Sequence, residues 1–326
     1  MNRGLLGANP RNATNPSTHG TEMDADVKRR MKEIGGEAIL FDVSAREYTT
    51  FRTGGNVEAM YRAGNLGGLK HMVAFLVDQG IPYLVMGSGS NLLVRDGGFD
   101  GVAIILDGSL ASVEDCTVAE ATILAGAGLR MHNLVEYCAE KGLAGMEFMA
   151  GIPGTLGGAV AMNAGSWGKE IREVISEVSV LTANGIVETR DGLSLPFTYR
   201  ELDLPPGAII LNAKLSLRFD KPALIRKRVA SYLRQRKERF PLDMPSAGSI
   251  FRNPEGGHAG RLIDAAGLKE TVIGGAMISP KHANFIVNTG SSSASDVVAL
   301  MDLARVKVKE MFNIQLIPEI KVVGKE

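Results

Sequence analysis

Three glycine-rich segments and three isolated polar side chains are the parts of this sequence that could support chemistry. The glycine-rich segments are residues 52–56, 87–91 and 151–165. The polar side chains are those of Arg200, Ser249 and Glu319. Glycine permits positive φ and close approach of the backbone to another body. The three segments are therefore suited to contact with a flat ligand or with another part of the chain.

Segment 151–165, GIPGTLGGAVAMNAG, has no charged side chain, no histidine and no cysteine. It has no group that could donate a proton strongly or ligate a metal. Segment 87–91, GSGSN, follows an expected strand at 83–86, and its consecutive backbone N–H groups and hydroxyls are suited to a diphosphate. An ordinary turn is the alternative interpretation of this second segment.

Two common nucleotide-binding motifs are absent. The G-x-G-x-x-G fingerprint fails because Leu92 stands where the third glycine should be, and no G-x-x-x-x-G-K-[ST] loop occurs. The sequence thus argues against a Rossmann dehydrogenase and a phosphate-loop nucleotide triphosphatase.

Each isolated polar residue also has a structural interpretation. Ser249 is typical of a turn, and the absence of a G-x-S-x-G elbow argues against a hydrolase nucleophile. Arg200 is compatible with an exposed loop, and Glu319 with the solvent face of an edge strand over 314–320.

The remaining candidates for chemistry are histidines and cysteines. His258 and His282 lack the spacing of a metal-binding pair, so no metal site is predicted. Cys116 and Cys138 lie in apolar surroundings and are expected to be buried, inert thiols.

Taken in order along the chain, these segments resemble the UDP-N-acetylenolpyruvoylglucosamine reductases (MurB). The matching blocks are residues 52–56, 87–93, 151–165, 199–200, 245–254, 273–276, 281–288 and 318–319. They span about residues 40–324 and resemble the shorter subtype, because 199–200 is followed closely by the expected domain boundary. Glu201-Leu202 departs from the pattern, since many relatives carry a serine two residues after the arginine.

The resemblance implies an NADPH-dependent flavoenzyme. Such an enzyme passes a hydride through FAD to the enolpyruvyl ether of UDP-N-acetylglucosamine, and the product is UDP-N-acetylmuramate for peptidoglycan. It implies that Arg200 binds the substrate carboxylate through two parallel hydrogen bonds, that Ser249 donates the proton, and that Glu319 stabilises the developing charge. Glu319 can do so only if it is protonated, so we expect burial to raise its pKa.

The same resemblance implies the ligand contacts. The residues expected to bind FAD are Arg52, Thr53, Gly54, Gly87, Ser88, Gly89, Ser90, Asn91, Leu92, Gly151, Ile152, Pro153, Gly154, Gly158, Ala159 and Asn163. Tyr199, Asn253 and Lys281 are expected to contact the substrate. The flavin should be non-covalent, because residues 87–98 contain neither His nor Cys.

The elements that must position these residues alternate between helix and strand. We expect helices at 66–79, 131–141, 223–239, 259–266 and 294–312, a hairpin at 176–189, and strands at 208–219 and 315–323. The basic helix 223–239 should place Ile225, Val229, Tyr232 and Leu233 on one apolar face.

The implied fold class is α+β. It consists of an FAD-binding fold of the vanillyl-alcohol-oxidase (PCMH) type made of two α/β subdomains, followed by a C-terminal α+β substrate domain. We expect a disordered tail at 1–22, the FAD-binding domain at 23–220 with its subdomains divided near 107, and the substrate domain at 221–326.

Composition restricts the partners. With 36 basic and 36 acidic residues, no net field favours nucleic acid or a membrane. No apolar run has the length of a membrane helix, and residues 1–20 lack the apolar core of a signal peptide. We therefore expect a cytoplasmic monomer.

Two alternatives stay open at this point. A flavin oxidase of the same fold would explain the glycine segments but not the Arg200, Ser249 and Glu319 blocks. A nucleotide-sugar-binding regulator without chemistry is the second alternative, and it would not bind FAD.

Overall fold

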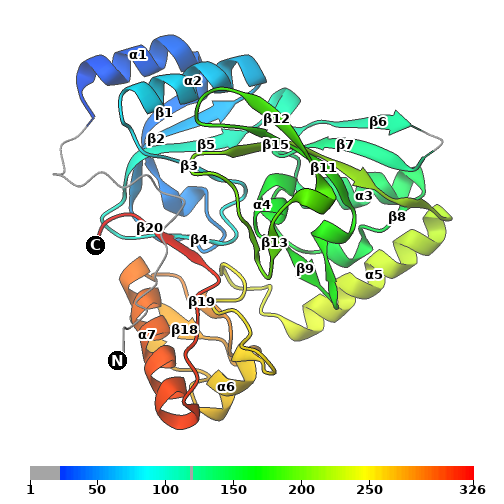
Figure 1. Cartoon of the computed structure of the whole chain (residues 1–326). Helices are drawn as coiled ribbons and strands as arrows, with labels where there is room; N and C mark the ends of the chain where they lie inside the picture. Colours follow the sequence, from blue (N-terminus) through cyan, green and yellow to red (C-terminus); the bar gives the residue numbers. More distant parts are fainter. Residues whose placement is uncertain (1–22, 118–119) are drawn as a thin grey trace, which may run out of the picture.

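The computed structural model describes residues 23–117 and 120–326 and is drawn in Figure 1. The expected tail at 1–22 lies outside the described residues. Of the helices in the described part of the chain, none combines the length and the apolar character needed to cross a membrane.

The first sheet has four strands and precedes the other sheets in the chain. In pairing order its strands are β1 (Ile39–Ser44), β2 (Asn56–Ala63), β5 (Phe99–Leu106) and β3 (Tyr83–Val85). β1 is antiparallel to β2, whereas β2 and β3 run parallel to β5. Helices α1 (Ala25–Gly35) and α2 (Leu66–Asp78) lie beside this sheet (Figure 1). The helix expected at 66–79 is thus confirmed.

Helix α2 forms because its apolar residues recur with helical spacing. Leu69, Met72, Val73 and Leu76 lie on one face and are buried. The Asn65 side chain caps the first turn by accepting a hydrogen bond from the Gly68 N–H.

The second sheet has five antiparallel strands. In pairing order they are β12 (Val187–Asp191), β11 (Ile175–Leu181), β15 (Ile209–Ser216), β7 (Thr122–Gly126) and β6 (Val113–Thr117). Strands β11 and β12 confirm the expected hairpin. Helices α3 (Met131–Lys141) and α4 (Leu156–Ala161) belong to this part of the chain. The helix expected at 131–141 is confirmed, and it ends at Gly142, whose φ is +70°.

The strand expected at 208–219 is interrupted in the structure. Strand β15 ends at Ser216, and β16 (Arg218–Phe219) pairs instead with β8 (Leu143–Ala144). Further short strands are β9 (Gly165–Ser166), β10 (Lys169–Glu170), β13 (Phe197–Thr198) and β14 (Glu201–Leu202). Single 3-10 turns cover Gly36–Ala38, Ala45–Glu47, Gly108–Ala111, Glu147–Met149, Ile171–Glu173 and Gly192–Ser194.

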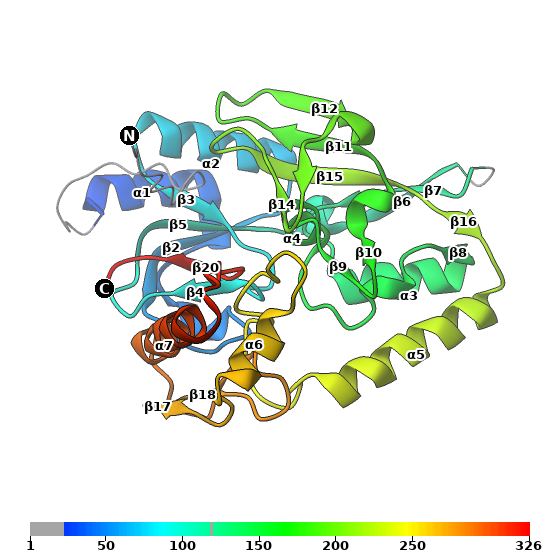
Figure 2. The same ribbon diagram turned by 60° about the horizontal axis from the view of Figure 1, so that its bottom comes forward.

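Helix α5 (Pro222–Arg239) runs along one side of the molecule toward the C-terminal part (Figure 2). Ile225 is buried with Ala139 and Ala144, and Val229 packs against them. Arg228 forms ion pairs with Glu147 at 2.8 Å and with Asp220 at 2.6 Å. These pairs fix the helix to the 3-10 turn that begins at Glu147 and to the segment just before the helix.

The expected apolar face of α5 is only partly correct. Tyr232 packs against the main core, but Leu233 is 43% exposed. The difference arises because Leu233 lies beyond the contact with Ala139 and Ala144, next to the backbone of Gly151.

The C-terminal part has its own core. It contains α6 (Ala259–Ala265), β17 (Val272–Ile273), β18 (Ala276–Ile278), β19 (Ile286–Asn288) and α7 (Ala294–Phe312). Its hydrophobic cluster includes Phe251 and Val297, and it also takes in Phe51 and Leu93 from the first part of the chain. The helix expected at 294–312 is confirmed, and the Ser293 and Asp296 side chains form a capping box at its start.

The last strand is shorter than expected. Strand β20 (Lys321–Val323) pairs in parallel with β4 (Leu92–Val94), but residues 314–318 make only one isolated bridge, between Pro318 and Phe251. The interpretation of Glu319 as the solvent face of an edge strand is therefore wrong. The Glu319 N–H donates to the carbonyl of Ile250 at 2.7 Å, so the backbone is held against the segment around Ser249 rather than against a neighbouring strand.

The cysteine prediction is confirmed for Cys138. The residue is 1% exposed, and burial raises the pKa of Cys138 to about 12, which keeps its thiol unreactive. The side chain of Cys116 lies outside the described part of the structure.

Candidate active site

A cavity of about 800 Å³ lies where the two glycine loops, the end of α5 and the C-terminal part meet. The loops are segments 87–91 and 151–165. Most of the residues predicted for a site line this cavity: Gly87, Ser88, Gly89, Ser90, Asn91, Leu92, Ile152, Pro153, Gly154, Gly158, Ala159, Arg200, Ser249, Asn253, Lys281 and Glu319. The fold thus brings together residues as far apart in the sequence as Gly87 and Glu319.

The two glycine loops touch each other as well as the cavity. The Ser90 hydroxyl donates to the Pro153 carbonyl at 3.0 Å, and a Cβ added to Gly87 would lie 2.5 Å from Oγ1 of Thr155. Gly154 has a φ of +134°, which a residue with a side chain rarely adopts. The glycines therefore permit close packing within the protein and also line the cavity, and their contact with a flat ligand stays a prediction.

Thr155 lines the cavity but was not among the predicted residues. Its side chain accepts a hydrogen bond from the Gly158 N–H and so caps α4. A threonine immediately before a short run of small residues is a helix-start signal, which could have identified it from the sequence.

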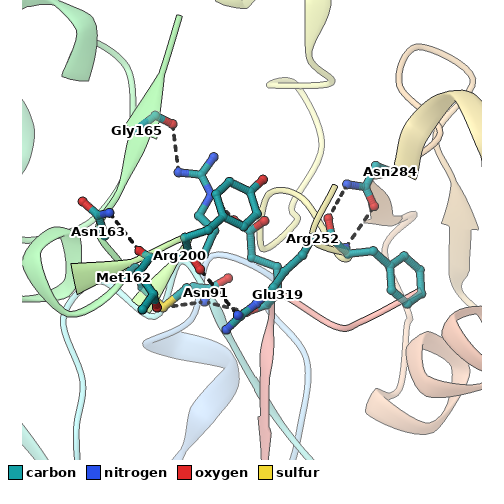
Figure 3. A network of polar contacts seen from close by, with 11 residues as sticks. Asn91, Met162, Asn163, Gly165, Arg200, Arg252, Asn284 and Glu319 are labelled. Atoms are coloured by element: carbon teal, nitrogen blue, oxygen red, sulfur yellow. Dashed lines mark hydrogen bonds and ion pairs between the residues drawn. The ribbon is translucent and has the colours of Figure 1, made fainter. Parts of the chain in front are cut away.

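Arg200 is held in the turn between β13 and β14 with a φ of +61°. Its Nη1 donates to the Gly165 carbonyl at 3.2 Å, and its Nε lies 3.2 Å from Oε1 of Glu319 (Figure 3). The Nε contact is an ion pair without the direction of a hydrogen bond. The guanidinium also lies 5.3 Å from the ring centre of Tyr199.

Glu319 is largely buried, with its side chain 15% exposed. Burial raises the pKa of Glu319 above 4.5, while the charges of Arg200 and Arg252 act in the opposite direction. The expectation that burial raises this pKa is confirmed. The Asn91 side chain donates to the Glu319 backbone carbonyl at 3.1 Å (Figure 3). Segment 87–91 is thus directly connected to Glu319.

The raised pKa of Glu319 makes the stability of the folded protein depend on pH. In the unfolded chain the pKa is near 4.5, so the folded state binds this proton more tightly. The contribution of Glu319 to stability is complete below that value and is lost as the pH rises through the folded-state pKa. A tenfold difference in proton affinity corresponds to about 1.4 kcal/mol.

We therefore expect Glu319→Gln to raise the melting temperature at pH 8 and to have little effect below pH 4.5. Thermal unfolding measured across this pH range tests the expectation. The exposed Glu310→Gln variant, on the outer side of α7, is the control and should show no such pH-dependent gain. A Glu319→Gln variant that is less stable than the wild type at pH 8 would contradict the expectation.

Ser249 follows Gly248, whose φ is +76°, in a loop fixed on its far side. The Ile250 N–H donates to the Asn284 carbonyl at 2.9 Å, and the Phe251 N–H donates to the Asn284 side chain at 3.0 Å. The Ser249 side chain lines the cavity, and no hydrogen-bond partner for its hydroxyl occurs within residues 23–117 and 120–326. The hydroxyl is thus available to a ligand.

Six predicted residues do not line the cavity: Arg52, Thr53, Gly54, Gly151, Asn163 and Tyr199. Thr53 is fully buried, and its hydroxyl donates to the Ser292 carbonyl at 2.6 Å. Asn288 donates to the Arg52 carbonyl at 3.2 Å, and a Cβ on Gly54 would collide with the Val94 backbone. Residues 52–54 thus join the first part of the chain to the C-terminal part, and their cofactor contacts stay a prediction.

The other three lie next to the cavity wall. Gly151, with a φ of +73°, faces the side chains of Leu233 and Arg236. Asn163 is fully buried behind the wall. Tyr199 is 43% exposed beside Arg200.

The end of the basic helix contributes residues that sequence reasoning did not assign. Arg236 and Arg239 line the cavity, where their guanidinium groups lie over the rings of Phe240 and Trp167, at 5.1 and 4.8 Å from the ring centres. Burial lowers the pKa of Arg236 to about 10, and its Nε is buried without a hydrogen-bond partner in the described residues. The concentration of Arg and Lys in residues 223–239 was the available signal, but it did not show which of them face inward.

The charge of the cavity wall is predominantly basic. The basic residues are Arg200, Arg236, Arg239, Arg261, Lys269, Lys281 and Lys321, and the acidic residues are Asp264 and Glu319. Such a wall favours anionic ligands.

His258 and His282 also line the cavity. Burial lowers the pKa of His282, whose Nδ1 accepts from the Asn284 N–H at 3.3 Å. Within the described ranges, no group of three or more His, Cys, Asp and Glu side chains is arranged to hold a metal ion.

Comparison with known proteins gives consistent matches. Residues 240–323 match the family model for the C-terminal domain of UDP-N-acetylenolpyruvoylglucosamine reductase, and residues 57–190 match the model of an FAD binding domain. UDP-N-acetylenolpyruvoylglucosamine reductase from Acidiphilium cryptum strain JF-5 is 41% identical over 300 residues, covering 92% of this chain and 96% of the relative. The reductase of the same name from Syntrophus aciditrophicus strain SB is 39% identical over 305 residues, covering 93% and 97%.

A solved structure is similar as well. The crystal structure of UDP-N-acetylenolpyruvylglucosamine reductase (MurB) from Thermus caldophilus superposes with a TM-score of 0.75 at 37% identity. The match covers 86% of this chain and 97% of that one.

Proposed function

The chain belongs to the UDP-N-acetylenolpyruvoylglucosamine reductase family, and on this premise we propose that it reduces the enolpyruvyl ether of UDP-N-acetylglucosamine with NADPH as the hydride donor. It is an FAD-dependent oxidoreductase with an FAD-binding fold of the vanillyl-alcohol-oxidase type and a C-terminal α+β domain. The product of the proposed reaction is UDP-N-acetylmuramate, used in peptidoglycan synthesis. The observation that carries the proposal is the meeting of Arg200, Glu319 and Ser249 at one cavity walled by two glycine loops.

The backbone and hydroxyl groups that line the cavity are suited to binding FAD. Segments 87–92 and 152–159 present backbone and hydroxyl groups to one continuous space, and the buried indole N–H of Trp167 lacks a partner among the described residues. Ser88, Ser90 and Gly154 are the residues we expect closest to the diphosphate. When bound, FAD supplies a carrier that takes a hydride from NADPH and passes it to the terminal vinyl carbon of the substrate.

Arg200 is proposed to stabilise the charge that hydride addition creates. The electron pair moves toward the substrate carboxylate and forms an enediolate, which a guanidinium can bind with two parallel hydrogen bonds. Arg200 is suited to this because it lines the cavity and its Nη1 is anchored to the Gly165 carbonyl.

Glu319 is proposed to assist in its protonated form. A neutral carboxyl can donate a hydrogen bond to the enediolate, whereas a carboxylate would repel it. Burial supports the neutral form, and the ion pair with Arg200 opposes it. An anionic substrate bound to Arg200 would offset the guanidinium charge that lowers the pKa of Glu319. Substrate binding would therefore favour the protonated form of Glu319 further.

Ser249 is proposed to donate the proton that completes the reaction. The proton passes from Oγ to the carbon that bears the carboxylate, and the serine recovers a proton from water. A serine hydroxyl is a weak acid, but the carbon of an enediolate is strongly basic, so position matters more than acidity. The free hydroxyl at the cavity wall supports this role.

The basic wall supports the choice of ligands. NADPH and the sugar nucleotide both carry a diphosphate, and Arg236 and Arg239 place two guanidinium groups at the cavity. From the sequence we also propose that the enzyme is a cytoplasmic monomer.

The proposed function is tested by an anaerobic titration of the purified enzyme. We expect a yellow protein whose visible flavin absorbance is bleached by NADPH and restored by the enolpyruvyl sugar nucleotide. Bleaching by a hydroxy acid or an alcohol, with the colour restored by oxygen and not by the enolpyruvyl sugar nucleotide, would instead indicate a flavin oxidase. A colourless protein that fails to take up FAD would indicate a sugar-nucleotide-binding regulator.

A further inference from the structure

Asn163 is a fully buried polar residue behind the cavity wall, at the end of segment 151–165. Its Nδ2 donates to Oε2 of Glu170 and to the carbonyl of Thr198, both at 2.9 Å. Its Oδ1 accepts from the Arg172 N–H at 3.4 Å. A buried amide with every donor used fixes the groups around it, because breaking one bond leaves an unpaired polar group.

The contact with Thr198 lies two residues before Arg200 (Figure 3). Thr198 ends β13, and Tyr199 and Arg200 form the turn into β14. Each of these strands has only two residues, so the hairpin cannot hold its own shape. Arg200 moreover has a φ of +61°, a strained conformation for a residue with a side chain. The turn therefore depends on contacts from outside it.

Two of those contacts come from segment 151–165, and others come from Arg252, which donates to the Tyr199 carbonyl at 3.4 Å, and from Glu319, which pairs with Arg200. Asn163 donates to the backbone just before the turn, at Thr198. The carbonyl of Gly165 accepts a hydrogen bond from the Arg200 guanidinium, which lies at the end of the turn. Asn163 is itself held firmly, because Glu170 also pairs with Arg172 at 2.8 Å and its N–H is capped by Glu173. The segment that forms the glycine-rich wall of the cavity thus also sets the position of the arginine.

We propose that Asn163 is a positioning residue for Arg200: its amide fixes the 199–200 turn relative to the glycine-rich wall and so aims the guanidinium at the substrate. This inference rests on the proposed role of Arg200. Asn163 is fully buried and does not line the cavity, so its removal should affect the step that uses Arg200 and leave the other step unchanged.

The test uses the FAD-loaded enzyme and follows the two half-reactions separately by stopped flow. Asn163→Gly removes the amide but tolerates the φ of +38° at this position. We expect reoxidation by the enolpyruvyl sugar nucleotide to slow about tenfold, since a small misplacement of a catalytic group costs rate. Reduction of the flavin by NADPH should stay within about twofold of the wild type.

A matched control is Asn313→Gly. Asn313 also has a positive φ, at +56°, and lies exposed at the end of α7, where its side chain contacts Lys309. It should leave both half-reactions unchanged. If Asn163→Gly fails to retain FAD, Asn163→Asp replaces it, because aspartate keeps the size and the bond from Arg172 but cannot donate to Thr198. The same tenfold loss is then expected.

The combination with Arg200→Ala shows whether Asn163 acts through Arg200. If it does, adding Asn163→Gly to Arg200→Ala should slow reoxidation no further. An additive tenfold loss, or equal damage to both half-reactions, would overturn the inference. If Arg200→Ala alone leaves reoxidation intact, the proposed function of Arg200 fails, whereas an intact Asn163→Gly beside an impaired Arg200→Ala refutes only the positioning role.

Discussion

Ser249→Ala should slow reoxidation of the reduced enzyme by substrate about 10²- to 10⁴-fold, the range expected when a positioned proton donor is lost. Reduction of the flavin by NADPH should be nearly unchanged, because that step needs no proton from Ser249. The hydroxyl is suited to the role because it lines the cavity, while the backbone on either side is held by Gly248 and Asn284. Anaerobic stopped-flow measurement of each half-reaction checks the result.

The matched control is Ser246→Ala in the same loop. Ser246 does not line the cavity, and its carbonyl, which the substitution preserves, accepts from the Thr50 hydroxyl. The control should show wild-type rates in both directions. Equal slowing of both half-reactions in Ser249→Ala would contradict the proton-donor role and point to a general disturbance of the site.

Arg200→Ala should slow the same reoxidation step about 10²- to 10³-fold, as expected for the loss of a group that stabilises charge in the transition state. Its side chain is only 22% exposed and lines the cavity, so its charge is weakly screened there. Arg200→Lys should recover part of the loss, because lysine supplies the charge but not the two parallel hydrogen bonds.

The arginine substitution has a second expected effect. The charge of Arg200 lowers the pKa of Glu319 against the influence of burial. Its removal should therefore raise the pKa of Glu319 further, and the pH dependence of the residual reoxidation rate should move upward. Arg190→Ala is the control, since Arg190 pairs with Glu188 on strand β12 and does not line the cavity. A residual activity with an unchanged pH profile would show that Arg200 and Glu319 do not interact in the working enzyme.

Much of the fold could be predicted because local patterns specify it. The helix at 131–141 needs only its apolar spacing and the glycine that ends it, and both occur within a dozen residues. The hairpin of β11 and β12 is likewise encoded by alternation and a short turn. Strand lengths were predicted less well, because strand pairing determines them. The expected strand 208–219 is divided because β16 pairs with β8, and the final strand is shorter because the Glu319 N–H bonds to the Ile250 carbonyl.

The candidate site divides in the same way. Arg200, Ser249 and Glu319 were identified from an ordered series of short blocks, and the structure places all three at one cavity. Residues 52–54 belong to the same series, yet the structure uses them to join the two parts of the chain. A matching sequence block indicates that a residue type is required at a position, but it does not indicate whether that residue contacts a ligand or another part of the chain.

The sequence by itself determined the family, the main helices and strands, and the residues that carry the proposed chemistry, because each depends on residue type and order. Only the tertiary structure decided that Glu319 is buried beside Arg200, that Arg236 and Arg239 face the cavity while Leu233 is exposed, and that Asn163 supports the 199–200 turn. These properties depend on distances and on access to water between segments far apart in the chain. Segment 151–165 shows both sides: its composition predicts no acid, base or metal ligand, and its packing places Asn163 and Gly165 against the turn that carries Arg200.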